Sequence, residues 1–404
     1  MVFAIAGVAM ALVAVRPWRL PAWTWPALGA AIVIALGHER LAEAVVAVAQ
    51  QWNVLLFILG LMGLAAAAEE SGAFAWITAV LLERAGGSRR RLFVLLFVTG
   101  AALTLVLSND ATAIGLTPIV YRALVSASAD DAMPFLFGCT FVADTASFGL
   151  PFANPANVLI LPHARLWPYI AHLGPPQVLA IALNLVIFLA IFRSRLRGRY
   201  EVQPAMPPSA PAVRTIVVAA VVAVAYIVAM ELRFPLGPVA ALGALAAIVV
   251  GRVAPKPALR HVSWSTFALL AGVFVLLDAI ARAGFVDWAL RELEGAARHG
   301  ALAADAWAAF GSAIVSNALN NLPVAVASSY VVAHAPSEHL AYALIAGVDL
   351  GPNLTTAGSL ATILWMGSLR KRGVHVDALE YIRLGAIVVP ATILVTVLWL
   401  WLVR

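Results

Sequence analysis

The sequence predicts an all-α polytopic membrane protein made of two inverted-topology repeats. Of the 404 residues, 63% are hydrophobic and only 11% are charged, and the mean hydropathy is +0.95. Many apolar runs reach the length of about 20 residues that a helix needs to cross a bilayer. Three motifs also recur in the same order before and after one Arg- and Pro-rich stretch. A membrane protein with an internal repeat is therefore expected.

Apolar segments predict about ten transmembrane helices. By residue number they are 1–15, 20–37, 52–69, 134–165, 176–193, 213–231, 235–251, 264–282, 340–369 and 381–403. Asn-rich sequence interrupts two further segments, 91–125 and 305–335, so each is expected to be a re-entrant helical hairpin of two half-helices. Segments 134–165 and 340–369 are overlong and carry Gly, Pro and Asn at their centres. We expect each of these two to be a broken helix.

Basic residues give the expected orientation. They stand in short clusters between apolar runs, which is the pattern that orients membrane helices and not one that binds nucleic acid. With Met1 outside, all but seven of the 26 Lys and Arg residues fall on the cytoplasmic side. The seven are Arg40, Arg165, Arg233, Arg282, Arg291, Arg298 and Arg404. Both termini are then expected outside, with the first apolar run kept as a helix because its positive charge follows it.

Three pairs of motifs define the repeat. The stretch "VLLFILGLMGLAAAAEESGAFAWI" resembles "STFALLAGVFVLLDAIARAGFVDW", "SNDATAIGLTPIV" resembles "SNALNNLPVAVAS", and "DTASFGLPFANPANVLI" aligns with "DLGPNLTTAGSLATILW". Each repeat contains five crossings, and an odd number places the second repeat upside down. We expect a first repeat at 1–192, a cytoplasmic linker at 193–214 and a second repeat at 215–404. Asn109 and Asn317 should then be equivalent and face each other near the midplane.

Four interruptions of membrane helices predict a polar cavity for a small solute. Each interruption frees backbone groups that protein, water or a ligand must satisfy. Half-helix termini supply partial charges, and the Asn, Ser and Thr side chains supply donors and acceptors. The candidate solute-binding residues are Ser108, Asn109, Thr112, Asn154, Asn157, Ser316, Asn317, Asn320, Asn321, Asn353, Thr355, Thr356 and Ser359.

Acidic residues beside these interruptions are candidates for proton coupling. A carboxyl group within a membrane is costly unless it faces a cavity or a partner, and this applies to Asp110, Asp144 and Asp349. Three further acidic residues lie at equivalent ends of two repeat-related helices: Glu69, Glu70 and Asp278. For these residues a structural ion pair or a position at the membrane interface is as good an explanation as a role in transport. Five histidines near helix ends are expected to be solvated: His163, His172, His334, His339 and His375.

The motifs resemble those of the arsenite efflux permease family, ArsB, within the ion transporter superfamily. The resemblance covers nearly the whole chain, and "GVDLGPNLTTAGSLATILW" is its most specific part. It implies multi-pass insertion in a bacterial or archaeal inner membrane and export of arsenite and antimonite, as oxyanions or neutral hydroxides, in exchange for protons. A peripheral arsenite-stimulated ATPase, ArsA, is an optional partner in such systems.

The residues agree with that chemistry and leave one main rival. Arsenous acid is a small uncharged trihydroxide, which suits a cavity of Asn, Ser, Thr and backbone groups. None of the four breaks contains Arg or Lys, so import of an anion is disfavoured. A sodium/proton antiporter remains the alternative, because Asp110, Asp144 and Asp349 could hold a cation. An intramembrane enzyme lacks a paired Asp-rich metal motif and a Ser-His dyad, and Cys139 as the single cysteine excludes a thiolate metal cage, so no cofactor is expected.

Overall fold

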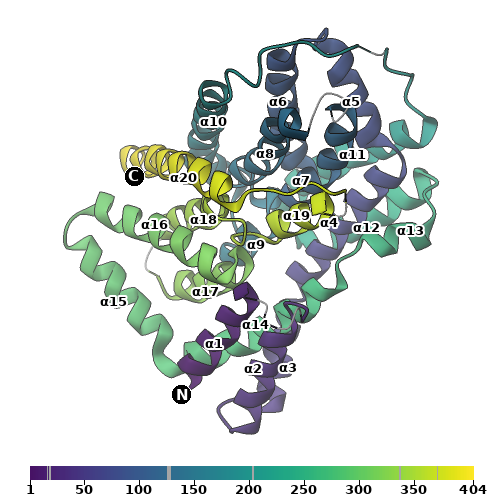
Figure 1. The fold of residues 1–404 in the computed structure, drawn as a ribbon. Coiled ribbons are helices and arrows are strands. Elements are labelled where there is room, and N and C mark those ends of the chain that lie inside the picture. Colours follow the sequence, from purple (N-terminus) through teal and green to yellow (C-terminus); the bar gives the residue numbers. More distant parts are fainter. Residues whose placement is uncertain (16, 18–19, 125–128, 203, 336–337, 371) are drawn as a thin grey trace.

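A computed structural model of the chain is helical throughout its described part, which comprises all residues except 16, 18–19, 125–128, 203, 336–337 and 371 (Figure 1). Within that part no strand is present. Seven of the described helices are long and apolar enough to cross a membrane, and four shorter apolar helices accompany them. The protein is therefore an all-α, multi-pass membrane protein, as the composition predicts.

The helices form two series with the same order of elements. The first series is α1 (Val2–Val15), α2 (Thr24–Ala35), α3 (Leu41–Ala49), α4 (Trp52–Glu70), α5 (Ala73–Arg84), α6 (Arg89–Leu107), α7 (Asn109–Leu124), α8 (Ala129–Thr145), η2 (Pro151–Ala153), α9 (Pro155–Ile160) and α10 (Leu166–Ile191). The second is α11 (Ala210–Glu231), α12 (Leu236–Val250), α13 (Pro255–His261), α14 (Trp264–Ile280), η3 (Ala281–Phe285), α15 (Val286–Ala297), α16 (Ala301–Leu319), α17 (Asn321–His334), α18 (His339–Leu350), η4 (Gly351–Leu354), α19 (Leu360–Arg370) and α20 (Ala378–Leu402).

In each series two apolar helices precede a short helix, a long helix and a second short helix. A hairpin (α6–α7 or α16–α17), a broken helix (α8–α9 or α18–α19) and a final long helix then follow. The two hairpins and the two broken helices lie where the interrupted segments predict them.

Some boundaries differ from the prediction. Helix α10 begins at Leu166, ten residues before the expected start, because Pro175 and Pro176 lie inside the helix instead of beginning it. Helix α11 begins inside the predicted linker, where the Ser209 hydroxyl caps the helix by accepting a hydrogen bond from the Ala212 amide at 3.2 Å. The first limb of each hairpin has 19 residues. At 1.5 Å per residue such a limb is about 28 Å long, which is more than a half-helix.

The two series interlock through direct helix contacts. Helix α4 packs along α12, α2 along α14, and α10 along α20. The α4–α12 contact depends on Gly60, because a Cβ atom there would collide with the Ala240 backbone. The backbones of these two helices consequently approach very closely, and the helices from both parts of the sequence form a single body.

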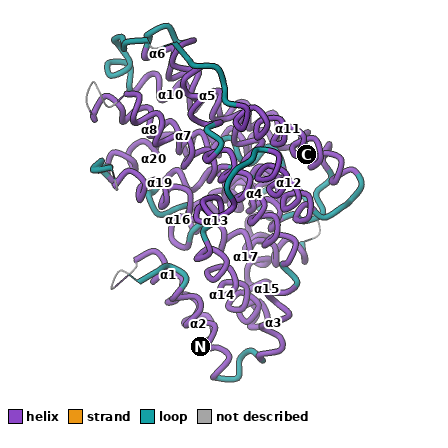
Figure 2. Tube along the Cα trace, turned by 90° about the vertical axis from the view of Figure 1, so that its right-hand side faces the viewer, coloured by secondary structure: helices purple, strands orange, loops and turns teal. Residues whose placement is uncertain are grey.

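One face of this body, called here the linker face, carries the segment between α10 and α11. The Tyr200 hydroxyl donates to the Leu82 carbonyl at 2.6 Å, and the Ser209 hydroxyl donates to the Ser71 carbonyl at 3.3 Å. The linker face therefore includes the ends of α4 and α5. Figure 2 shows α5, α6 and α10 toward one end of the molecule and α2, α3 and α15 toward the other.

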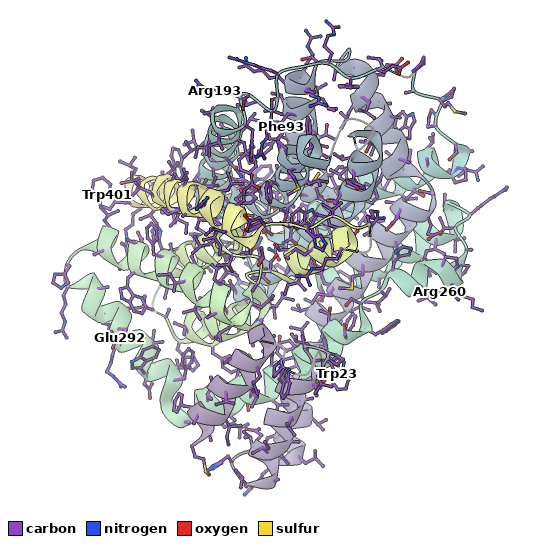
Figure 3. The ribbon with its side chains drawn as sticks, in the orientation of Figure 1. Trp23, Phe93, Arg193, Arg260, Glu292 and Trp401 are labelled. Atoms are coloured by element: carbon purple, nitrogen blue, oxygen red, sulfur yellow. The ribbon has the colours of Figure 1, made fainter. Side chains whose placement is uncertain are left out.

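The opposite face is defined by the other end of α4 and by α15. Helix α4 starts at Trp52, beside α3, about 28 Å from its end at the linker face. Figure 3 shows Glu292 of α15 and Trp401 of α20 on one side of the molecule and Arg260 of α13 on the other. The ends of α4 and α14 thus lie on different faces, as inverted repeats require.

Candidate functional site

The tips of the two hairpins share an unusual backbone conformation. Ser108, between α6 and α7, has φ 97° and ψ 163°, and Asn320, between α16 and α17, has φ 78° and ψ 153°. Positive φ is strained for any residue with a Cβ atom, and such strain is found where the surrounding structure holds a segment in place for function. The shared conformation makes Ser108 and Asn320 the equivalent residues.

This equivalence corrects the sequence alignment of the hairpins by four residues, because Ser108 pairs with Asn320 and not with Ser316. Asn317 lies inside α16, one turn before the tip, whereas Asn109 is the first residue after its own tip. The sequence alignment had matched the two Ser-Asn pairs, Ser108-Asn109 and Ser316-Asn317. The residue with positive φ marks where each hairpin reverses direction, and that residue does not belong to the second pair. Asn109 consequently corresponds to Asn321 and not to Asn317.

The first broken helix is closed by asparagine side chains. Asn154 caps α9 by accepting a hydrogen bond from the Ala156 amide at 3.0 Å. Asn157 donates to the carbonyls of Ser147 at 2.8 Å and Leu150 at 3.1 Å. Both carbonyls lie at the break, where the α-helical hydrogen bonds are interrupted, so Asn157 removes part of the cost of interrupting the helix.

The second broken helix is closed by a hairpin residue. The Asn317 amide donates to the Gly351 carbonyl at 2.8 Å, and its oxygen accepts from the Thr355 hydroxyl at 2.8 Å. Ser359 caps α19 by accepting from the Thr362 amide at 3.0 Å. The second hairpin is thereby fastened to the break that its own repeat contains.

The two breaks also meet each other. The Asp349 carboxylate, at the end of α18, accepts hydrogen bonds from the Ser147 hydroxyl and the Asn154 amide, both at 2.8 Å. In the reverse direction the Asn353 amide donates to the Phe141 carbonyl at 3.1 Å and to the Thr145 hydroxyl at 3.3 Å. All five side chains are buried. We call this contact of the two breaks the central junction.

Asp144 joins the first hairpin to the central junction. Its Oδ1 accepts a hydrogen bond from the Asn109 amide at 3.1 Å, whereas its Oδ2 is buried without a hydrogen-bond donor. The Oδ1 atoms of Asn109, Asn157, Asn321 and Asn353 and the Ser316 Oγ are likewise buried without a partner in the described chain. Buried polar atoms are normally satisfied. The region around the junction therefore has an excess of hydrogen-bond acceptors.

Two separate cavities reach the hairpin tips from the linker face. A cavity of about 340 Å³ is lined by Asn320 and Thr356 at its inner end and by Trp23, Ser265 and Arg370 farther out. We call it the second-hairpin cavity.

The smaller cavity, of about 80 Å³, is lined by Ser108 and Asp110 of the first hairpin and by Glu69, His261 and Ser263 at the linker face. We call it the first-hairpin cavity. No described residue lines both cavities, so the predicted polar residues are not gathered in a single space.

The other residues singled out in the sequence make contacts outside the central junction. The Thr112 hydroxyl donates to the Ser108 carbonyl of its own hairpin at 3.0 Å. His339 was expected to be solvated, but it is buried in α18, 3.2 Å from the Asp305 carboxylate. The burial of His339 at the start of α18 depends on packing with other helices, which the position of the residue in the sequence does not reveal.

Sequence reasoning missed several residues of the central junction. Ser147 and Thr145 follow Asp144 directly in the quoted motif, so their position was a usable signal. Asn184 donates to the Thr145 hydroxyl at 2.8 Å, and with His172 and Gln177 it is one of the few polar residues in the apolar helix α10. Thr140 and Thr362 approach each other within 3.5 Å across the two breaks. Threonine is common in membrane helices, and nothing in the sequence distinguishes these two from the others.

Inverted helical repeats, paired hairpins and two broken helices that meet at buried polar groups define a secondary-transporter type of membrane protein. The chain belongs to the CitMHS family, described as citrate transporter, whose pattern matches residues 4–347. It is similar to an arsenical pump membrane protein of Escherichia coli, with 28% identity over 92% of this chain and 91% of the relative. A protein of the same name from Yersinia enterocolitica shares 29% identity over 85% of each chain.

A solved structure has a similar fold. The YdaH transporter of Alcanivorax borkumensis, described as having an unusual topology, superimposes with a TM-score of 0.57 at 14% sequence identity. The match covers 89% of this chain and 86% of that chain. At this identity the likeness concerns the fold alone. Together with the relatives above, it makes this protein an ArsB-like membrane transporter.

Proposed function

We propose that the protein exports arsenite and antimonite, as neutral trihydroxides, across the inner membrane in exchange for protons. The excess of buried acceptors around the central junction is the observation that carries this proposal. A trihydroxide presents three O–H donors, and the unpartnered oxygens of Asn109, Asn321 and Asn353 are acceptors. Among the described side chains that bond across the junction, none is Lys or Arg. A neutral, donor-rich solute suits that environment.

The chemistry of the junction argues against citrate, which the family description names. Three carboxylates placed beside Asp144 and Asp349 would add negative charge to two buried acids. A buried charge without a partner is strongly unfavourable. Among the described residues that line the second-hairpin cavity, Arg370, at its outer part, is the one basic side chain. The relatives named as arsenical pump membrane proteins support the uncharged solute instead.

The direction of transport follows from the proposed membrane orientation. We assign residues 1–192 and 215–404 to the two repeats and place the 193–214 linker in the cytoplasm, because most basic residues then lie inside. The second-hairpin cavity opens toward the linker face and ends at Asn320 and Thr356. A solute would thus enter it from the cytoplasm, as the first half of an export cycle requires.

Coupling requires groups that gain and lose protons near the solute. A neutral solute gains nothing from the membrane potential, so uphill export depends on a second flux. Asp144 has one unpartnered oxygen and Asp349 accepts two hydrogen bonds between the repeats. Protonation of Asp349 would change how the two breaks hold each other, and protonation of Asp144 would change its bond to Asn109 of the first hairpin. We assign proton binding to Asp144 and Asp349, with Asp110 beside them on the first hairpin.

The alternative function is sodium/proton exchange. The unpartnered Asp144 Oδ2 and Asn109 Oδ1 are carboxylate and carboxamide oxygens, which are the ligands that hard cations prefer. A cation bound there would take the place of the proton.

Uptake into everted membrane vesicles distinguishes the two functions. Vesicles that contain the protein are given an imposed pH gradient, acid inside and without ATP, and the accumulation of arsenite and of sodium is followed separately. Arsenite accumulation that collapses with an uncoupler supports the proposed function. Sodium accumulation with no movement of arsenite would establish the alternative.

A further inference from the structure

We propose that the first-hairpin cavity conducts protons between the linker face and the central junction, with His261 and Glu69 as its outer proton-exchanging groups and Asp110 as its inner one. The solute would use the second-hairpin cavity, so the two fluxes would enter the protein by different routes. This inference rests on the proposed function for its direction, but it is drawn from the geometry of the smaller cavity.

The outer end of the cavity carries a histidine held between two carboxylates. His261 Nε2 lies 2.8 Å from Glu70 Oε1, and His261 Nδ1 lies 3.3 Å from Glu69 Oε2. The His261 side chain is 37% exposed, so it contacts water as well. Histidine is the side chain that exchanges protons most readily near neutral pH. With one carboxylate at each ring nitrogen, it can accept a proton on one side and release one on the other.

The inner end of the cavity carries a carboxylate on the first hairpin. Asp110 and Ser108 line the cavity together with Glu69 and His261. No described residue forms a hydrogen bond or ion pair with the Asp110 side chain. The preceding residue, Asn109, donates to Asp144 at 3.1 Å. Asp110 therefore adjoins, in the sequence, the residue that binds Asp144 at the central junction.

The cavity is large enough for a short chain of water molecules. A volume of about 80 Å³ is enough for two or three water molecules at about 30 Å³ each. A short chain of water molecules can carry a proton from one titratable group to the next. The rest of the lining is apolar, with Phe74, Ile58 and Leu61 among it. No described residue of this lining is shared with the second-hairpin cavity.

The repeat supplies an internal comparison on the opposite face. There α3 packs against α14, as α13 packs against α4 on the linker face. Arg282 takes the place of a histidine at that contact, 2.7 Å from Asp278 and 3.0 Å from Glu43. Arginine does not lose its proton in proteins, so this cluster cannot exchange protons through its cation. Of these two clusters, the linker-face cluster is the one that contains a histidine, and that histidine lines a cavity.

The linker-face cluster has two further charged residues near it on α13. The titratable residues that border it are Glu69, Glu70, Asp110 and His261, and the remaining charged residues of α13, Lys256 and Arg260, are exposed. Figure 3 shows Arg260 at the outer edge of the molecule. His261 is therefore the residue of α13 that contacts the two carboxylates.

Proton and arsenite fluxes in proteoliposomes test the proposal. Purified protein is reconstituted with a trapped pH-sensitive dye, and arsenite entry is measured with and without an imposed pH gradient. For His261→Gln and Glu69→Gln we expect pH-driven arsenite accumulation and coupled proton flux to fall at least about tenfold. Exchange of arsenite at equal concentrations without a gradient should stay within about twofold of wild type, because the larger cavity is unchanged. Exposed residues serve as controls: His375→Gln and Glu83→Gln should retain both activities.

A rescue measurement separates proton transfer from a structural role. Imidazole added to His261→Ala should restore pH-driven transport, since a free base can replace the missing ring, whereas a purely structural histidine would give no recovery. Wild-type rates in both His261→Gln and Glu69→Gln would overturn the cavity assignment. If the wild-type protein transports arsenite without moving protons, the result contradicts the proposed arsenite/proton exchange. The assignment of the first-hairpin cavity as a proton route is then also wrong.

Discussion

Asp349 and Asn154 are 195 residues apart in the sequence, yet the Asn154 amide donates a hydrogen bond of 2.8 Å to the Asp349 carboxylate. Asp349 lies at the end of α18, the first part of the second broken helix. Asn154 caps α9, the second part of the first broken helix. Because Ser147 donates to the second oxygen of the same carboxylate, both oxygens of Asp349 are used as acceptors. The two repeats are thus connected at the positions where each has lost its helical hydrogen bonds.

The two buried acids should respond differently to substitution by asparagine. In Asp144→Asn the amide oxygen can keep the bond from Asn109, and the new NH2 group takes the place of an oxygen that has no donor. Thermal stability should change little, whereas pH-driven arsenite export should be lost and downhill exchange kept. In Asp349→Asn one of two donors loses its acceptor, which costs about 1–3 kcal/mol. Unfolding in detergent and vesicle transport together measure both effects. Unchanged pH-driven transport in Asp144→Asn would remove this residue from the coupling mechanism.

The hydroxyl of Thr355 should be needed to hold the second hairpin. It donates to Asn317 at 2.8 Å, and Asn317 in turn donates to the Gly351 carbonyl in the break. Thr355→Val keeps the shape and removes the bond, so we expect a loss of about 1 kcal/mol in stability and slower arsenite transport. Thr355→Ser keeps the hydroxyl and is the matched control. Equal behaviour of the two variants would show that the bond has no role.

The sequence revealed the architecture more completely than the contacts within it. Apolar length, basic clusters and recurring motifs were enough to predict ten crossings, two hairpins and two breaks, because each depends on local sequence. The hairpin register was wrong by four residues, because the positive φ of Ser108 recurs at Asn320 and not at Ser316, which the matching letters had aligned with it. The connection of Asp349 to Asn154, and the separation of Asp110 from Asn320 into two cavities, arise from packing between the repeats. Spacing along one chain does not contain that information.

Close approach of α4 and α12 makes Gly60 intolerant of a side chain. A Cβ atom at this position would collide with the backbone of Ala240 on the neighbouring helix, and a collision with backbone cannot be relieved by rotating a side chain. We expect Gly60→Ala to lower the thermal unfolding temperature and the yield of monodisperse protein. Gly7→Ala in α1 is the control, because its Cβ would meet nothing within 4 Å. A Gly60→Ala protein as stable as wild type would show that the helices separate readily.

Glu39 should make the protein less stable as the pH rises. Burial raises the pKa of Glu39 to about 7, against the opposing effect of Arg282, and neither carboxylate oxygen of Glu39 accepts a hydrogen bond in the described chain. Between the ordinary value near 4.5 and this raised value, the folded protein binds more protons than the unfolded chain. Its stability therefore falls over that range as pH increases and stays low above it.

Glu39→Gln cannot ionise and should lose this dependence on pH. Unfolding temperatures measured at about pH 5 and pH 8 should differ less in Glu39→Gln than in wild type. The exposed Glu294→Gln should keep the wild-type difference. A wild-type difference that persists in Glu39→Gln would assign the pH dependence to other groups.

Cysteine labelling can establish which face of the membrane carries the linker. Cys139 is the single natural cysteine and is fully buried, so an impermeant maleimide should report an introduced cysteine with little background. Glu201→Cys in the linker and Glu292→Cys in α15 place exposed thiols on opposite faces. Because most basic residues accompany the linker and positive residues are retained in the cytoplasm, Glu201→Cys should be labelled in everted vesicles and protected in intact cells. Glu292→Cys should show the reverse pattern. Labelling of Glu201→Cys from outside intact cells would invert the proposed orientation, and the second-hairpin cavity would then open outward and support uptake instead of export.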